Sequence, residues 1–226
     1  MINSKDIKEL VASSGAALCG IASIDSFTDA PKGFHPTDIY WDAKSVIVFA
    51  CRISEGTLIA KNPIPYTVME SIVQSKLNEI ALILSLALED AGSMAVLIPS
   101  TPYDYWDEDN LEGKGILSLK HLGYYAGLGA IGLNTLLCNN IYGNLIKLGA
   151  IITNAVLEAD DLQQEEINCE SCNLCIESCP VGAITVNGVS QKKCRSHSEI
   201  INKRGVEIYS CNICRKICPN RNGINK

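Results

Sequence analysis

Cysteine is the residue whose type and spacing in this 226-residue chain could do chemistry, and there are 11 of them. Eight fall in two sets near the C-terminus. The first set is Cys169, Cys172, Cys175 and Cys179, with spacing C-x2-C-x2-C-x3-C followed by Pro180, and the second is Cys194, Cys211, Cys214 and Cys218, followed by Pro219. The N-terminus lacks the apolar run of a signal peptide, so we expect a reducing compartment, where clustered thiols usually hold metal.

The spacing of these thiols predicts two [4Fe–4S] clusters with crossed ligation, as in bacterial two-cluster ferredoxins. Two-residue gaps let one tight turn aim three sulfurs at three corners of a cubane, whereas the fourth cysteine of the run lies too far along. We therefore predict Cys169, Cys172, Cys175 and Cys218 as the ligands of cluster 1, and Cys179, Cys194, Cys211 and Cys214 as those of cluster 2. Two structural zinc sites are the alternative, although zinc ribbons usually present two separated C-x2-C pairs.

The other three cysteines, Cys19, Cys51 and Cys138, stand among apolar neighbours. A free cysteine in such surroundings behaves as a small buried hydrophobic residue. We assign these three to the core.

Charge divides the chain into two predicted domains. Residues 1–162 hold 10 basic and 19 acidic residues, a net charge of −9, whereas residues 163–226 hold 9 and 6, a net charge of +3. The change coincides with the acidic stretch EADDLQQEE at 158–166, so we predict domains at 1–160 and 161–226. A positive excess beside the cysteines would stabilise anionic clusters.

Apolar periodicity predicts an α+β fold for the first domain. Strands are expected at 16–23, 44–53, 94–100 and 145–158, and helices at 4–15, 64–92 and 116–129, while 101–115 has no period and reads as a loop. The most apolar run, at 80–88, is too short to span a bilayer. We expect a cytoplasmic protein with no membrane partner.

The segment LKHLGYYAGLGAIGLNTLLCNNIYGNLIKLGAIITNAVLE at 119–158, together with the cysteine order after it, resembles the cobalamin-dependent epoxyqueuosine reductases, which are related to the reductive dehalogenases. The resemblance is clearest over residues 115–220. It implies a nitroreductase-like mixed α/β sheet domain, followed by a bacterial two-cluster ferredoxin-like domain. It also implies that cobalamin is held by residues of this segment, namely Lys120, His121, Ala126, Gly127, Leu128, Gly129, Ile131, Gly132, Asn134, Thr135 and Gly143.

Gly127, Gly129 and Gly132 have a physical interpretation of their own. Glycine removes Cβ atoms from a turn, so a large flat ligand can approach the backbone, whose amides can donate hydrogen bonds. The alternative is a packing turn that binds no ligand.

Three departures from the family pattern concern the substrate. Leu133 stands where the family commonly has lysine, and no acidic residue lies between Glu112 and the glycine motif, where the tRNA-modifying enzymes carry one. Those enzymes also continue into a helical tRNA-binding region, whereas this chain stops at Lys226. We therefore expect that tRNA is not a substrate or partner. The candidate proton donors that could replace the acid are Tyr103, Asp104, Tyr105, His121, Tyr124 and Tyr125.

These observations predict an oxidoreductase in which two [4Fe–4S] clusters pass electrons to cobalamin, which reduces a small organic substrate. The expected partners are a low-potential electron-donor protein, the small-molecule substrate and a second copy of the chain in a homodimer. Oxygen-sensitive clusters favour an anaerobic host. The alternative is a non-catalytic electron carrier whose first domain binds a partner protein or FMN.

Overall fold

A four-stranded antiparallel sheet forms the centre of the structure, a computed structural model that describes residues 2–163, 167 and 169–224. The strand order is β1-β2-β8-β3, with β1 at Leu18–Ser23, β2 at Ser45–Arg52, β8 at Ile146–Thr153 and β3 at Ala95–Ile98. The two central strands are buried along most of their length, because both faces of the sheet are covered. This explains why their sequences are nearly continuous apolar runs.

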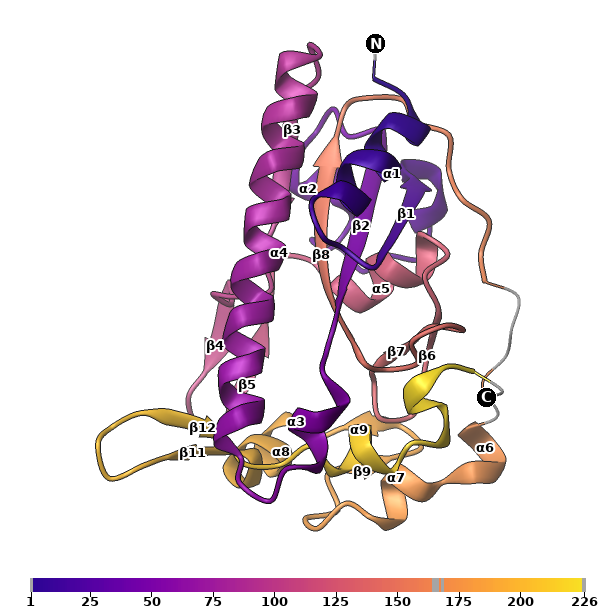
Figure 1. Ribbon diagram of the computed structural model, residues 1–226. Coiled ribbons are helices and arrows are strands. Elements are labelled where there is room, and N and C mark those ends of the chain that lie inside the picture. Colours follow the sequence, from indigo (N-terminus) through magenta and orange to yellow (C-terminus); the bar gives the residue numbers. More distant parts are fainter. Residues whose placement is uncertain (1, 164–166, 168, 225–226) are drawn as a thin grey trace.

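Helices cover the two faces of the sheet (Figure 1). Side chains alternate along a strand, so Ile47 and Phe49 of β2 pack under α1 (Ser4–Ser13) and α4 (Ile64–Asp90). Val46 and Val48 point the other way, into a second apolar cluster. That cluster is covered by the 3-10 helix η1 (Ile24–Phe27), α2 (Pro36–Ile39) and α5 (Leu119–Tyr125).

Within the described residues, α4 is the one helix long and apolar enough to cross a membrane by length and composition. The core helix of a soluble protein meets the same criteria. Leu77, Leu84 and Leu88 on its inner face are almost fully buried against the sheet. The helix is therefore weak support for a membrane protein.

The cysteine-rich tail packs at one end of the sheet, at the bottom of Figure 1. Its elements are short: α6 (Cys169–Cys172), α7 (Leu174–Glu177), β9 (Ile184–Thr185), β10 (Gly188–Val189), α8 (Gln191–Ser198), β11 (Glu199–Ile201), β12 (Glu207–Tyr209), α9 (Ile213–Ile217) and η2 (Pro219–Asn222). The tail touches the start of α4, where the Tyr209 amide donates to Thr67 Oγ1 at 3.0 Å. It also touches α3 (Glu55–Ile59), where Arg221 Nε lies 3.1 Å from Glu55 Oε1.

Two small hairpins lie between the sheet and the tail. The pair β6 (Ala130–Ile131) and β7 (Leu137–Cys138) follows α5, and the pair β4 (Tyr105–Asp107) and β5 (Glu112–Lys114) occupies the segment expected to be a loop. The expectation of a loop is wrong, because β4 and β5 pair as strands. They bury little side-chain surface, so their sequences lack the alternation of apolar and polar residues that predicts a strand. The hairpin is instead held by the side chain of Gln191, which accepts a hydrogen bond from the Gly113 amide and donates one to the Gly113 carbonyl oxygen.

The mixed α/β architecture predicted from the sequence is confirmed, and the main strands and helices form where they were expected. The division into domains at residue 160 stays a prediction. Residues 164–166 of the acidic stretch lie outside the described residues.

Candidate metal centre and cofactor cavity

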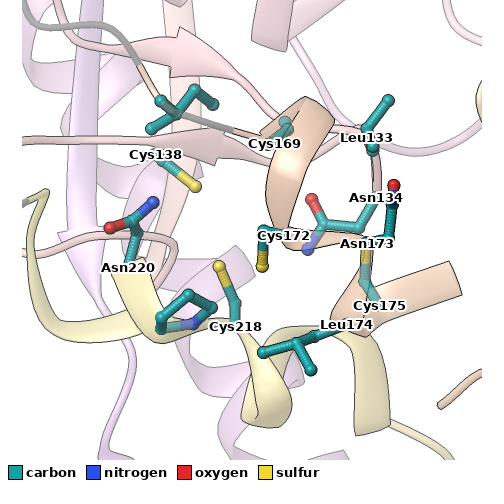
Figure 2. Close-up of a pocket in the computed structure, with 13 residues that line it drawn as sticks. Leu133, Asn134, Cys138, Cys169, Cys172, Asn173, Leu174, Cys175, Cys218 and Asn220 are labelled. Carbon is teal, nitrogen blue, oxygen red and sulfur yellow. The ribbon is translucent and has the colours of Figure 1, made fainter. Parts of the chain in front are cut away.

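A small cavity of about 20 Å³ lies between the β6–β7 hairpin and the tail, and we call it the cysteine cavity (Figure 2). All four thiols predicted for cluster 1 line it: Cys169 and Cys172 from α6, Cys175 from α7, and Cys218 from the end of α9. The fold therefore carries Cys218 back to the first cysteine run. Cys179, the fourth cysteine of that run, is not among the lining residues.

Electrostatic interactions link the thiols of the second quartet. Cys194 interacts with Cys211 and Cys179, and Cys214 interacts with Cys194, Cys211 and also with Cys175 of the first quartet. Burial raises the pKa of the Cys214 thiol to about 11. Within the described part of the chain, no three His, Cys, Asp or Glu side chains form a group that could hold a single metal ion. The assignment of ligands, and the choice between iron–sulfur clusters and zinc, stay predictions.

The environment of the thiols fits anionic clusters. Burial opposes ionisation of Cys179, yet the backbone amides of Val181 and Ala183 lower its pKa, and the Ala183 amide donates to Cys179 Sγ at 3.2 Å. The neighbouring side chain of Cys138 is the chief cause that lowers the pKa of Cys218 to about 6. Four thiols around one apolar space, with donors aimed at sulfur, are the donor set that a [4Fe–4S] cluster takes.

The segment that carries the glycine motif holds the tail in place. Asn134 Nδ2 donates to the carbonyl oxygen of Cys214 at 3.1 Å, and Asn144 Nδ2 donates to that of Arg215 at 3.3 Å. The Arg215 guanidinium in turn donates to the carbonyl oxygen of Asn144. Gly143 adopts a φ of +56°, and a Cβ there would overlap the carbonyl oxygen of Asn220. Residues 134–144 are thus a docking surface for the cysteine-rich tail.

The glycines of the motif pack against protein backbone. A Cβ on Gly127 would overlap the carbonyl oxygen of Asp161, and one on Gly129 would overlap that of Cys138. Gly132 and Asn134 line the cysteine cavity, while Ala126 and Leu128 lie in the second apolar cluster. This geometry agrees with the alternative in which the glycines form a packing turn that binds no ligand. Contact of these residues with a cofactor stays a prediction.

A larger cavity, of about 710 Å³, opens between the sheet, the β4–β5 hairpin and the tail, and we call it the large cavity. Of the residues predicted to hold the cofactor, Lys120 and Thr135 line it, whereas His121, Ile131 and Gly143 do not. Cys194 also lines it, so the large cavity borders the second quartet of thiols.

The lining of the large cavity is basic. Its charged residues are Lys114, Lys120, Lys147, Arg195, Arg215 and one acid, Glu199. Glu199 is 3.0 Å from Arg195 Nη1, and Lys147 pairs with Glu70 of α4. Burial lowers the pKa of Lys120, which forms no ion pair with a carboxylate among the described residues. The cavity can therefore attract an anionic ligand.

Among the predicted proton donors, Tyr103 lines the large cavity. Arg195 Nη2 donates to Tyr103 Oη at 2.7 Å, and the Arg195 guanidinium lies 5.0 Å from the centre of the Tyr103 ring. Trp106 stacks on Tyr103 with a separation of 5.9 Å between ring centroids. Since Arg195 follows Cys194 directly, this contact joins the mouth of the cavity to the second quartet.

The other candidates lie outside the lining. Asp104 and Tyr105 are exposed on the hairpin. His121 Nδ1 is 2.7 Å from Ser118 Oγ, and burial, with a smaller contribution from Lys120, lowers the pKa of His121. Tyr124 and Tyr125 pack edge to face, and Tyr125 also lies against Phe27. None of these five side chains is brought to the large cavity.

Sequence reasoning missed two residues. Cys138 was assigned to the core, and it is indeed 1% exposed, but it lines the cysteine cavity beside Cys218. Arg195 was not singled out, although it directly follows a predicted ligand. The signal for Cys138 was its position just after the glycine motif, but only the folded β7 strand turns it toward the tail.

Comparisons with solved structures show which proteins share the fold of this chain. No family model matches the chain. A structure of epoxyqueuosine reductase from Streptococcus thermophilus matches with a TM-score of 0.65 and 20% identity, covering 99% of this chain and 67% of the other. A reductive dehalogenase, described with a mechanism for B12-dependent dehalogenation, matches with a TM-score of 0.72 and 17% identity, covering 95% of this chain and 31% of the other. At these identities the matches show the fold, which both groups share with this chain.

The sequence matches are more specific. An epoxyqueuosine reductase from Lactococcus garvieae is 36% identical over 110 residues, which cover 44% of this chain and 31% of the relative. The alignment thus spans about a third of the curated relative. The resemblance to epoxyqueuosine reductases predicted from the sequence is confirmed.

The prediction that tRNA is not a substrate or partner is wrong. The relatives are epoxyqueuosine reductases, and a structure of one with an epoxyqueuosine-modified tRNA-Tyr stem loop matches with a TM-score of 0.64, 19% identity and coverage of 97% of this chain and 65% of the other. The prediction relied on where the chain ends and on a missing acid. Neither observation excludes RNA, because nothing follows from where the chain ends, and the lining of the large cavity is basic.

Docking of the tail on Gly143 can be tested by Gly143→Ala. We expect a loss of about 2 kcal/mol in the free energy of unfolding beyond backbone strain, because the new Cβ must push Asn220 away. Gly182→Ala is the matched control, since Gly182 has a φ of +57° and open space around its Cβ position. Urea unfolding of both variants measures the difference, and equal losses would contradict the docking role.

Proposed function

We propose that the chain is an iron–sulfur and cobalamin-dependent reductase of the epoxyqueuosine reductase type. The observation that carries this proposal is the shared wall of the large cavity: Cys194 comes from the tail, whereas Lys120 and Tyr103 come from the first part of the chain. A redox group bound at the second quartet would therefore border the space in which a cofactor and a substrate could sit. The relatives that share the fold support the same general class.

The metal part of the proposal assigns two [4Fe–4S] clusters with crossed ligation. The gathering of Cys218 with the first three cysteines of the run supports cluster 1, and the electrostatic neighbours of Cys194 and Cys214 support cluster 2. The tail at 161–226 would then be the two-cluster ferredoxin-like domain. Residues 1–160 would be the nitroreductase-like domain.

The cofactor part assigns cobalamin to the large cavity, with FMN as the less favoured alternative. The cavity's volume of about 710 Å³ lies within the range of ligand pockets, which supports a bound cofactor or substrate there. Cobalamin, when bound, supplies a metal centre that transfers electrons to an organic group. Lys120 and Thr135 are the described residues of the predicted set that could hold it. The apolar side chains of Leu117, Leu137 and Leu148 would exclude water from its faces.

In this proposal Tyr103 is the acid that donates a proton to the substrate. Tyr103 lines the large cavity, and its hydroxyl accepts a hydrogen bond from Arg195, which would stabilise the phenolate left after proton transfer. Stacking with Trp106 fixes the ring. Tyr103 thus offers a substitute for the acidic residue that the chain lacks ahead of the glycine motif.

Epoxyqueuosine in tRNA is the first substrate to test, because the curated relatives carry that name. The basic lining of the large cavity is suited to an RNA backbone, since phosphates are recognised by lysine and arginine. An electron-donor protein, a homodimer, a cytoplasmic location and an anaerobic host stay predictions.

The second candidate function is a non-catalytic electron carrier or reductase component. Leu133 in place of the family lysine and the absence of the acid favour it. In that case the first domain would bind a partner protein or a flavin, and Tyr103 would have no role in turnover.

Protein purified anaerobically from its native host should separate the two functions. The reductase is expected to contain about eight iron atoms per chain, to show a bound corrinoid spectrum, and to reduce an epoxyqueuosine-modified tRNA stem loop when a strong reductant is supplied. Iron with a flavin, or with no organic cofactor and no reduction of the stem loop, would favour the carrier. Zinc without a broad visible absorption band would remove both.

Crossed ligation predicts how serine variants group. Cys169→Ser and Cys218→Ser should change the electron paramagnetic resonance signal of one cluster, while Cys179→Ser and Cys214→Ser change the signal of the other. The reason is that a weaker oxygen ligand alters only the cluster to which it is bound. If Cys179→Ser changes the same signal as Cys169→Ser, each cluster takes consecutive thiols and the assignment fails.

The role of Tyr103 predicts that Tyr103→Phe lowers turnover by about 10²- to 10⁴-fold, because the phenyl ring keeps the packing and loses the proton. Single-turnover assays on the modified stem loop measure the rate. Tyr40→Phe serves as the control, since Tyr40 lines neither cavity. Unchanged turnover in Tyr103→Phe would assign the proton donor elsewhere.

A further inference from the structure

The longest helix, α4, turns an apolar face to solvent along one side of the molecule (Figure 1). Its inner face packs on the sheet, but five large aliphatic side chains on the outer face are between 44% and 62% exposed: Ile64, Val68, Ile72, Leu82 and Leu86. Among the exposed residues from 64 to 86 only Glu79 is charged, and it pairs with Lys76 at 3.0 Å. The solvent side of a surface helix normally carries many more charged residues, so this face is suited to a partner.

The apolar residues of this face are arranged symmetrically about Ser75. Val68 and Leu82 lie seven residues before and after Ser75, and Ile64 and Leu86 lie eleven residues before and after it. Seven and eleven residues are close to two and three whole turns of an α-helix, so all five side chains share one face. Two copies of α4 that pack antiparallel, with Ser75 at a two-fold axis, therefore place apolar residues against apolar residues. Val68 of one copy meets Leu82 of the second, and Ile64 meets Leu86.

Charge at the ends of the face favours the same arrangement. Lys61 and Glu89 lie fourteen residues before and after Ser75, and both are exposed. Antiparallel packing brings Lys61 of each copy close to Glu89 of the other, whereas parallel packing would set like charges side by side. The chain has a net charge of −6, so two copies repel each other over much of their surface. The face from 64 to 86 escapes this repulsion, because the charges of Lys76 and Glu79 cancel.

The middle of the face argues against a lipid partner. Ser71, Ser75 and Asn78 are the exposed residues there. Their short side chains let two helices approach closely and can hydrogen-bond across the axis, whereas in hydrocarbon they would lack partners. Helices that lie on membranes usually carry lysine and arginine beside the apolar face, and the exposed residues from 64 to 86 include neither.

We propose that the outer face of α4 is the interface of a two-fold symmetric dimer, in which the α4 helices of two copies pack antiparallel with Ser75 at the axis. A helix of 27 residues is about 40 Å long, and a contact of that length and roughly 10 Å wide buries on the order of 400 Å² per copy. This area is at the low end for specific interfaces, so we expect a reversible dimer that dissociates on dilution.

The dimer leaves the candidate site complete in each copy. The cysteine-rich tail touches the start of α4, where Tyr209 contacts Thr67. Antiparallel packing therefore puts the two tails at opposite ends of the dimer, and each large cavity stays within one chain. The inference thus does not rest on the proposed function, and neither iron content nor turnover enters its test.

Charge exchange across the axis tests the interface and its register. Val68→Lys and Leu82→Glu each place a charge against an apolar side chain of the second copy, and each change occurs twice in a dimer. We expect each single variant to weaken dimerisation by about 100-fold. The double variant Val68→Lys/Leu82→Glu should recover most of the loss, because each introduced lysine then opposes an introduced glutamate. Sedimentation velocity over a range of protein concentrations measures the dissociation constants.

Val186→Lys is the matched control, because Val186 is an exposed valine at the turn between β9 and β10 of the tail. It is expected to dimerise like the unaltered protein. Positions 68 and 82 are about half exposed, so urea unfolding of the monomers should be unchanged in both single variants.

The outcomes that overturn the proposal are distinct. A chain that stays monomeric at millimolar concentration, or a dimer that both single variants leave intact, would remove the interface. Weakening by both single variants without recovery in the double variant would exclude the antiparallel register. Flotation with vesicles of phosphatidylcholine and phosphatidylserine tests a lipid partner: binding that Val68→Lys and Leu82→Glu abolish, in a monomeric chain, would assign the face to a membrane surface instead.

Discussion

Close backbone contact between the glycine motif and the cysteine-rich tail is the constraint on which the rest of the structure depends. Gly127 admits the carbonyl of Asp161, and Gly143 admits that of Asn220. Asn134 and Asn144 then satisfy carbonyl groups of α9 that would otherwise be buried without partners. Because these contacts leave no room for a Cβ atom, a larger residue at either glycine would push the tail away. Both cavities lie at that junction.

Charge is arranged around the same junction. The tail carries the positive excess, while the first part of the chain is acidic, so the two parts attract each other and the thiols lie in a favourable field. Arg195 connects the two sites most directly, since it neighbours Cys194 in the chain and binds Glu199 and Tyr103 through its side chain. Its guanidinium also lies over the ring of Trp106. A change at this residue would affect the hairpin, the tail and the large cavity together.

Sequence reasoning was most successful where one local rule acts. Apolar runs predicted the strands of the sheet, and the four thiols that spacing assigned to cluster 1 line one cavity, although their role as ligands stays a prediction. It failed at the β4–β5 hairpin, whose exposed strands have no apolar period and depend on Gln191 of the tail. The prediction that tRNA is not a substrate or partner was also wrong. It relied on where the chain ends and on one absent acidic residue, whereas the family resemblance indicated the opposite.

The sequence alone determined the two thiol sets, the core strands and the family resemblance, because spacing and apolar pattern are properties of neighbouring residues. Tertiary structure decided that Cys138 faces Cys218, that Tyr103 meets Arg195, and that Lys120 and Cys194 share a cavity. Each of these pairs joins segments distant in the chain. Their proximity depends on how the tail docks on the sheet, and that depends on the sum of many backbone and side-chain contacts that no local pattern records.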